Sequence, residues 1–444
     1  MGDEAKPNPT GSVLEDRVSR RPKRHMYRLA RALYHSIPES LRAIGYPIAL
    51  HSQLLKRLRP EMWIIEGQER ESKLRLSICL YITTNEYKRY LENLTFGTSF
   101  EAKYIGQTWL WNAFRETPRA AAGCSMTIAE VHDRHLNWMG PAAGIVIPAW
   151  IRGSIDLPRG PEQMNRDSIK TVLRKIMKQG MEYEVTRDPK HFDDFYQNMY
   201  VPHTTKRHGD CVHLSSREKV WALFEKGELI VVKKHGESTA GKLITYKDGI
   251  PYMTHLGVRD GRMDLIDEGA IGAANELTLQ YLESNGHREV HFGQSRGFLN
   301  DGVLQFKKKY GHKVVGKSDH KFLLKITSDT SATRAFLQNN PFIFEHMGGL
   351  HGAAFLSDQV PLTQQVLERF NKQLSQAGLA QLVVFSFSSG EATPIDEMAH
   401  TPPPNRSGSE TYEYLSQVNG QSLVRRLGNI AIDKVIAIHQ TQTR

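Results

Sequence analysis

Short segments rich in apolar residues follow one another in the third quarter of the chain. They predict strands at 181–185, 229–234, 240–247, 252–257, 289–292 and 322–326. Helical spacing predicts helices at 165–179, 189–200, 267–284 and 301–310, between those strands. This order of elements predicts a mixed α/β sheet covered by helices. It begins with helix, strand and helix, continues with a meander of three strands, and ends with helix, strand, helix and strand.

The rest of the chain divides at Pro- and Gly-rich stretches. Extended patterns at 74–83, 104–114 and 145–155 predict a mixed α/β subdomain over 61–157, followed by a linker at 156–161. A helix at 364–376 and a buried strand at 382–387 predict a further α/β piece. We expect a basic, partly disordered or helical arm at 1–60, units at 61–157, 158–326 and 327–388, and a linker and tail at 389–444.

The net charge of +10 is concentrated near the N-terminus. Residues 17–60 carry eleven Lys and Arg against Glu39, so the remaining chain is electrically balanced. Within this arm Met26, Leu29, Leu33 and Ile37 share one helical face. The arm is predicted to bind tRNA or an anionic membrane surface, or else to be a solvated leader.

Hydropathy and cysteine usage limit the class of protein. The longest apolar run, 140–151, is shorter than the roughly 20 residues of a membrane span and contains two prolines. Three distant cysteines, Cys79, Cys124 and Cys211, fit reduced thiols. We expect a cytoplasmic protein, peripheral at the membrane if the arm binds lipid headgroups.

The block from Gly293 to Gly311 joins a strand end, a polar turn and a basic helix. Together with the order of elements before it, this block resembles the GNAT superfamily of N-acyltransferases, and within it the Fem-type branch. The resembling stretches are Arg174-Lys175-Ile176 with Gly180, Phe195-Tyr196-Gln197-Asn198-Met199-Tyr200, Lys206-Arg207-His208-Gly209 and Gly293 to Gly311. The resemblance covers about residues 165–326. It implies a tandem of two GNAT-like units, the first degenerate and at 61–157, with an extra C-terminal α/β segment.

The resemblance also implies a catalytic group. Lys307 takes the place of the Fem-type lysine that stabilises developing negative charge, and Asp301 is expected to cap its helix. Tyr310 is a candidate to protonate the leaving group, and His208 is a candidate general base. The alternatives are a solvated basic face at 307–309 and a packed tyrosine.

Donor binding is expected beside the third meander strand and at the next helix N-terminus, where N–H groups attract phosphate. The expected donor-binding residues are Leu256, Gly257, Arg259, Gly261, Gly269 and Gly272. The usual family loop carries no acidic pair, whereas Asp267-Glu268 stands here. The donor therefore stays open between acyl-CoA, acetyl-CoA included, and aminoacyl-tRNA.

Acceptor binding is expected on polar groups near the same strand ends. The expected residues are Tyr200, Arg207, Gln294, Ser295, Arg296, Asn300 and Asp301, facing a small-molecule amine. His203, His208, Cys211 and His213 match no standard zinc spacing, so no metal is predicted.

Two functions follow from these observations. The first is transfer of an acyl or aminoacyl group to an amine of a cell-envelope, polysaccharide or natural-product precursor. The second is a non-catalytic GNAT-like module that its basic arm recruits to RNA or membrane.

Overall fold

The computed structural model describes residues 57–112, 121–136, 144–208, 214–388, 412–414, 427 and 429–439. Nearly all of the basic arm and most of the expected tail lie outside these residues. By contacts the chain divides into Met1–Leu58 and Arg59–Arg444, and the second unit is described here.

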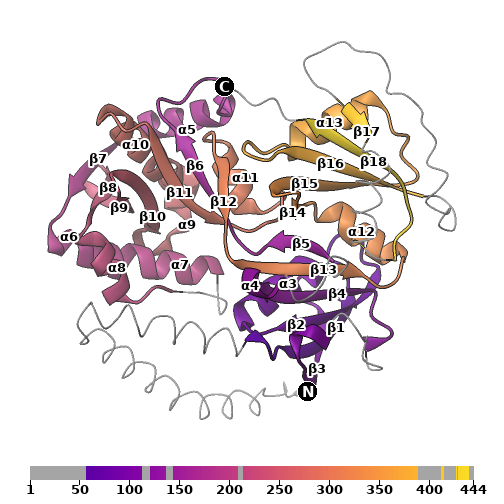
Figure 1. Ribbon diagram of the computed structural model, residues 1–444. Coiled ribbons are helices and arrows are strands. Elements are labelled where there is room, and N and C mark those ends of the chain that lie inside the picture. The colour runs from indigo at the N-terminus through magenta and orange to yellow at the C-terminus, as the bar shows by residue number, and fades with distance from the viewer. Residues whose placement is uncertain are drawn as a thin grey trace, which may run out of the picture. The chain divides into compact units, whose positions relative to one another are not determined.

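A seven-stranded mixed sheet forms the centre of the expected acyltransferase unit (Figure 1). Its strands, in spatial order, are β12 (Lys313–Lys317), β6 (Ile151–Asp156), β11 (Glu289–Ser295), β10 (Ile250–Val258), β9 (Glu237–Lys247), β8 (Gly227–Lys234) and β7 (Met181–Thr186). Its helices are α5 (Arg166–Lys178), α6 (Pro189–Asp194), the π-helix η3 (Phe195–Tyr200), α7 (Val201–His208), α8 (Arg217–Phe224), the 3-10 turn η5 (Arg259–Gly261), α9 (Met263–Glu268), α10 (Ala270–Ser284) and α11 (Gly302–Lys308).

Alternating side chains of this sheet serve two helical layers. Val232 and Ala240 pack against α5 and α10, whereas Val231 and Leu243 pack against α6, η3 and α8. Figure 1 shows the sheet between these two sets of helices. Successive side chains of one strand are thus buried on opposite faces of the sheet, which explains the continuous apolar runs of its strands.

A six-stranded sheet with α3 (Asn85–Phe96) and α4 (Asp133–Leu136) lies beside the seven-stranded one in the chain's described part. Its strands, in spatial order, are β3 (Phe100–Gln107), β1 (Glu61–Gln68), β2 (Arg75–Ile82), β4 (Met126–His132), β13 (His320–Ile326) and β5 (Ile145–Pro148), and η1 (Leu110–Asn112) follows β3. Cys79 and Cys124 are buried free thiols here, and Cys211 lies outside the described residues.

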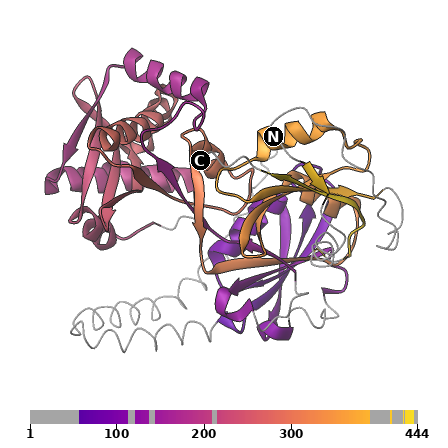
Figure 2. The ribbon, with the colours of Figure 1, turned by 45° about the horizontal axis from the view of Figure 1, so that its top comes forward.

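Strand exchange between these sheets corrects two sequence predictions. The strand at 322–326 does not close the seven-stranded sheet, because β13 pairs with β4 and β5. The single strand expected at 145–155 is two strands, β5 and β6, which belong to different sheets. Figure 2 shows the orange segment from β12 to β13 passing from one sheet to the other. The expected boundaries at 157 and 326 stay predictions. However, β6 precedes the first boundary and belongs to the seven-stranded sheet, and β13 precedes the second and belongs to the six-stranded sheet.

The helix expected at 267–284 is also divided. Gly269 adopts φ 108°, ends α9 and precedes α10. A left-handed backbone there interrupts the helix, and glycine accepts it without the penalty of a Cβ.

The C-terminal segment forms a five-stranded sheet. It contains β14 (Phe342–His346), β15 (Gly349–Leu356), β16 (Gln381–Phe387), β18 (Ile432–His439) and β17 (Tyr412–Tyr414), with α12 (Ser331–Asn339) and α13 (Gln364–Leu374). Some of its apolar residues share a buried cluster with the six-stranded sheet, and others pack with Ile151, Leu304 and Val314 of the seven-stranded unit.

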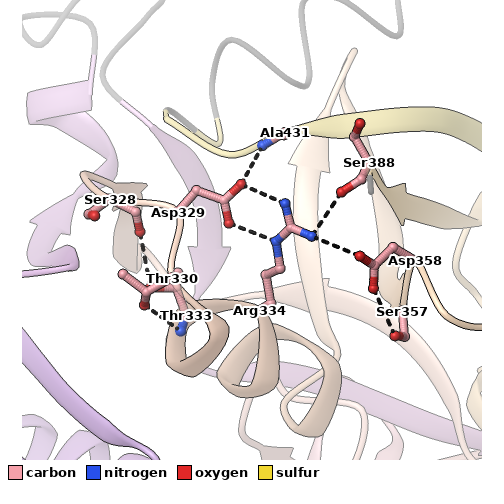
Figure 3. A network of polar contacts seen from close by, with 9 residues as sticks. All are labelled: Ser328, Asp329, Thr330, Thr333, Arg334, Ser357, Asp358, Ser388 and Ala431. Carbon is pink, nitrogen blue, oxygen red and sulfur yellow. Dashed lines mark hydrogen bonds and ion pairs between the residues drawn. The ribbon is translucent and has the colours of Figure 1, made fainter. Parts of the chain in front are cut away.

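One guanidinium links the strand ends of this segment (Figure 3). Arg334 on α12 forms two hydrogen bonds to Asp329, at 2.8 and 2.9 Å, and one of 2.9 Å to the Ser388 carbonyl. Asp329 also accepts from the Ala431 N–H at 3.0 Å. Asp329 precedes α12, Ser388 follows β16 and Ala431 precedes β18. The network therefore joins the end of the sheet to its helix.

The three mixed sheets confirm a mixed α/β fold with an additional C-terminal α/β segment, as the sequence predicts. Among the described residues no helix combines the length and the apolar character needed to cross a bilayer.

Candidate active site

Strands β10 and β11 diverge in the middle of the seven-stranded sheet. They run parallel, yet only Tyr252 and His291 are in register, and the two rings stack with centroids 4.3 Å apart. Beyond this pair, a bulge between Met253 and Leu256 interrupts the pairing of β10 with β9. A bulge bends its strand and leaves ladder groups unpaired. The strands therefore lose their pairing beyond Tyr252.

A cavity of about 830 Å³ lies at this opening. Side chains from β9, β10 and β11 form its floor, and residues of α5, α7, α9, α10 and α11 form its walls. Its cationic residues are Lys175, Lys206, Arg207, Lys242, Lys307 and Lys309, and its described lining contains no Asp or Glu. Apolar walls with cations alone favour an anionic ligand that also carries apolar groups.

Lys307 lies in this cavity on α11. Its residue is 7% exposed, and its Nζ donates a hydrogen bond of 2.7 Å to the Gln294 carbonyl. Asp301 caps the helix by accepting from the N–H groups of Val303 and Leu304, as the sequence predicts. Burial and then the neighbouring Lys242 lower the pKa of Lys307 to about 7, against a smaller effect of Asp301. The amine is thus poised between its charged and neutral forms near neutral pH.

Lys242 on β9 is a second buried amine that sequence reasoning missed. Its residue is 6% exposed, lines the cavity and pairs in register with Leu256 beside the bulge. Burial lowers the pKa of Lys242 to about 7. A lysine inside an apolar strand, between Ala240 and Ile244, is the signal that could have revealed it.

Two further polar side chains line the cavity. The Tyr310 hydroxyl and the Asn275 Oδ1 are buried without a hydrogen-bond partner in the described structure. Burial raises the pKa of Tyr310 above its ordinary value, so the phenol keeps its proton at neutral pH. Buried polar groups without a protein partner mark positions where a ligand can supply the missing hydrogen bond.

The predicted donor-binding residues divide into two sets. Leu256, Gly261, Gly269 and Gly272 line the cavity. The other two, Gly257 and Arg259, have structural contacts elsewhere. A Cβ on Gly257 would lie 2.5 Å from the Tyr200 nitrogen, so this glycine allows β10 to pack on η3. Arg259 is held by Asp194 through bonds of 2.5 and 2.7 Å.

Asp267 and Glu268, the acidic pair because of which the identity of the donor stayed open, do not line the cavity. Glu268 forms a 2.8 Å ion pair with Lys234, and the Asp267 carbonyl accepts a 2.6 Å hydrogen bond from Lys175. The objection that these carboxylates raised against a phosphate-bearing donor is therefore removed.

The predicted acceptor-binding residues divide as well. Arg207 lines the cavity, and Gln294 and Asp301 contact or orient α11. Ser295 is buried at the end of β11, outside the cavity lining.

Three other acceptor candidates lie outside the cavity. The buried Tyr200 hydroxyl accepts a 3.1 Å hydrogen bond from the Ser215 N–H. Arg296 lies 3.5 Å above the Trp150 ring and binds Glu86 on α3 at 2.8 Å, so it joins the end of β11 to the six-stranded sheet's helix. Asn300 lines a separate groove and donates to the Asn339 carbonyl at 3.2 Å.

Part of the histidine-rich loop lies outside the described structure. The His208 side chain, Cys211 and His213 are not described, so the predicted base stays a prediction. His203 is buried and lines the cavity. Among the described residues no group of His, Cys, Asp and Glu could hold a metal ion.

The chain matches no family model and no curated protein. Solved structures that it resembles include L-PGS from Bacillus licheniformis, with 14% identity over 47% of this chain and 70% of that one, and a TM-score of 0.29. Another is the C-terminal domain of a putative lysylphosphatidylglycerol synthetase from Agrobacterium fabrum, with 13% identity over 62% and 83% of the chains and a TM-score of 0.31. FemX follows with 12% identity over 56% and 81% and a TM-score of 0.31. Identities and TM-scores this low carry no argument about this chain.

Proposed function

We propose that this protein is an N-acyltransferase. It moves an acyl or aminoacyl group from a thioester or an aminoacyl-tRNA to an amine of a cell-envelope, polysaccharide or natural-product precursor. The observation that carries the proposal is the divergence of β10 and β11 over a cavity that contains the Lys307 amine. A diverging strand pair leaves backbone groups to face a carbonyl, and an adjacent cation stabilises the oxyanion that forms.

The reaction assigns one task to each group. The acceptor nitrogen bonds to the carbonyl carbon, and the bond from that carbon to sulfur or to a ribose oxygen breaks. Lys307, as the ammonium, offsets the charge on the carbonyl oxygen during this exchange. Tyr310 is the candidate to supply a proton to the leaving group, because burial keeps its phenol protonated at neutral pH. The proton that the amine loses passes to a base, and His208 is the predicted one.

The donor carrier is anionic in this proposal. Coenzyme A and tRNA both bring phosphates, and Lys175, Lys206 and Arg207 bring positive charge to the cavity from α5 and α7. Lys175 and Lys206 also donate to the carbonyls of Asp267 and Asp260, which holds them beside the loop before α10. Both carriers occur in the cytoplasm, where we place the reaction.

Thermal unfolding in the presence of each carrier tests this assignment. A carrier that binds only the folded state stabilises it by about 2.7 kcal/mol at one hundred times its dissociation constant. We expect a higher melting temperature with coenzyme A or with aminoacyl-tRNA, and a smaller rise for the Arg207→Ser variant. The donor assignment is wrong if neither carrier changes the melting curve of the full chain.

A further inference from the structure

We propose that Lys242 and Lys307 together form a buried site for a carboxylate or phosphate group of the substrate. This inference rests on the proposed function, because the anionic group then belongs to the donor or to the acceptor. It adds a site that recognises a permanent negative charge of the substrate, beside the carbonyl that reacts. In the proposed function, Lys307 alone stabilises only the transient charge on the carbonyl oxygen.

The first support is the position of the two amines. Lys242 is on β9 and Lys307 is on α11, and both Nζ atoms lie 5.6 Å from the centre of the Phe292 ring on β11. Two residues 65 positions apart in the sequence thus bring ammonium groups to one aromatic ring. This juxtaposition places two amines, Lys242 on the floor and Lys307 on the wall, beside one ring in a single cavity.

The second support is the absence of a counterion. Within the described structure the Lys242 Nζ has no hydrogen-bond or ion-pair partner, and no carboxylate lines the cavity. Buried charges in proteins are paired, or they become neutral. An anionic ligand would complete this site by pairing with both amines.

The surrounding titratable groups leave no other occupant for this role. Facing or lining the cavity are His255 on β10, Lys175 on α5, His203, Lys206 and Arg207 on α7, Lys307 and Lys309 at α11, and Tyr310. Burial and then Lys242 lower the pKa of His255 to about 4, so this ring adds no charge near neutral pH. Burial and then Lys307 lower the pKa of His312 to about 3, so this ring adds no charge either. Asp301 is an acid that acts on Lys307, but its Oδ1 accepts from the N–H groups of Val303 and Leu304, and it does not line the cavity. The described residues that line the cavity therefore supply no carboxylate.

Proton uptake gives the site a distinctive signature. In the free protein both amines are partly neutral at pH 7 and largely neutral at pH 8, and a bound anion favours their charged forms. Binding therefore takes up protons, and for each coupled amine the affinity falls by up to about tenfold per pH unit above pH 7. An anion held only by solvent-exposed lysines would show no such loss, because exposed amines stay charged across this range.

Titration calorimetry with sulfate and with succinate tests the proposal on the full chain. Neither anion titrates between pH 7 and pH 9, so proton uptake reports on the protein. Tighter binding of sulfate points to a phosphate group, and tighter binding of succinate points to a carboxylate. We expect uptake of roughly one proton at pH 8 for each amine that engages the anion.

Matched variants decide which lysine is responsible. Lys242→Met keeps the length of the side chain and should weaken anion binding at least tenfold while abolishing part of the proton uptake. Lys247→Met removes an exposed lysine from the same strand and should leave both unchanged. Binding that is independent of pH in the wild type, or equal in Lys242→Met and wild type, overturns the proposal.

The two proposals fail in different ways. If anion binding depends on Lys242 but no acyl transfer is found, the anion site stands and the proposed acyltransferase function is wrong. If acyl transfer is found but anion binding does not depend on Lys242, the proposed function stands and the proposed anion site is wrong.

Discussion

At the residue scale, the buried amine of Lys242 contributes to the change of stability with pH. Its pKa falls from 10.5 in the unfolded chain to about 7 in the folded protein. Between these values the unfolded chain binds more protons, so stability rises with pH; below pH 7 the full cost of the buried charge remains. We expect Lys242→Met to have a higher urea midpoint than wild type at pH 7 and nearly the same midpoint at pH 10. A parallel pH dependence for Lys242→Met, wild type and the exposed control Lys247→Met would contradict the assignment.

The same scale shows the limit of sequence reasoning about single side chains. Lys307 and its Asp301 cap could be predicted, because a capped helix is a local pattern. The role of Arg259 could not, since its partner Asp194 is 65 residues away. Lys242 was missed because the strand at 240–247 was predicted from its apolar residues, and that prediction does not show whether a single lysine among them is buried.

At the scale of elements, the contact between β10 and η3 depends on Gly257. The Cβ of an alanine at this position would lie 2.5 Å from the backbone nitrogen of Tyr200, and backbone cannot rotate away as a side chain can. We expect Gly257→Ala to lower the free energy of unfolding by about 1–3 kcal/mol, the usual cost of overpacking. Gly302→Ala is the control, because nothing lies within 4 Å of its Cβ. Equal urea midpoints for the two variants would show that β10 does not pack so closely.

A buried ion pair fixes the linker before α5 to α10. Arg159 forms two hydrogen bonds of 2.8 Å to Glu276, and their side chains are 6% and 2% exposed. Removing one partner strands the other charge, so Arg159→Met should cost about 3–5 kcal/mol. The double variant Arg159→Met/Glu276→Met should recover most of that loss in chemical denaturation. Additive losses in this cycle would mean that the two groups act independently.

Pairing between distant elements is what the sequence could not supply. The meander from β8 to β10 is local, and its strands were predicted close to their observed bounds. The places of β6 and β13 depend on partners far along the chain, so the local patterns that located these strands could not assign them to a sheet.

At the scale of the whole molecule, the chain combines a neutral body with a basic arm. Replacing Arg20, Arg21, Lys23 and Arg24 by Gln in the full chain should weaken binding to tRNA or to phosphatidylglycerol vesicles at low salt. It should also reduce the salt dependence of that binding, because fewer counterions are released. The control variant replaces four exposed body lysines, Lys103, Lys190, Lys219 and Lys226, by Gln. An equal effect of the two variants, or no effect of the first, would show that the arm does not recruit these partners.

The most direct measurement of the central claim is acyl transfer itself, followed by mass spectrometry of an amine acceptor. The account predicts product with wild type and at least a hundredfold lower rate with Lys307→Met, a loss typical of a removed oxyanion-stabilising group. Lys308→Met, the next residue on α11, should keep the wild-type rate because its amine binds the Gln373 carbonyl and lies outside the cavity. Equal rates for Lys307→Met and Lys308→Met would contradict the account.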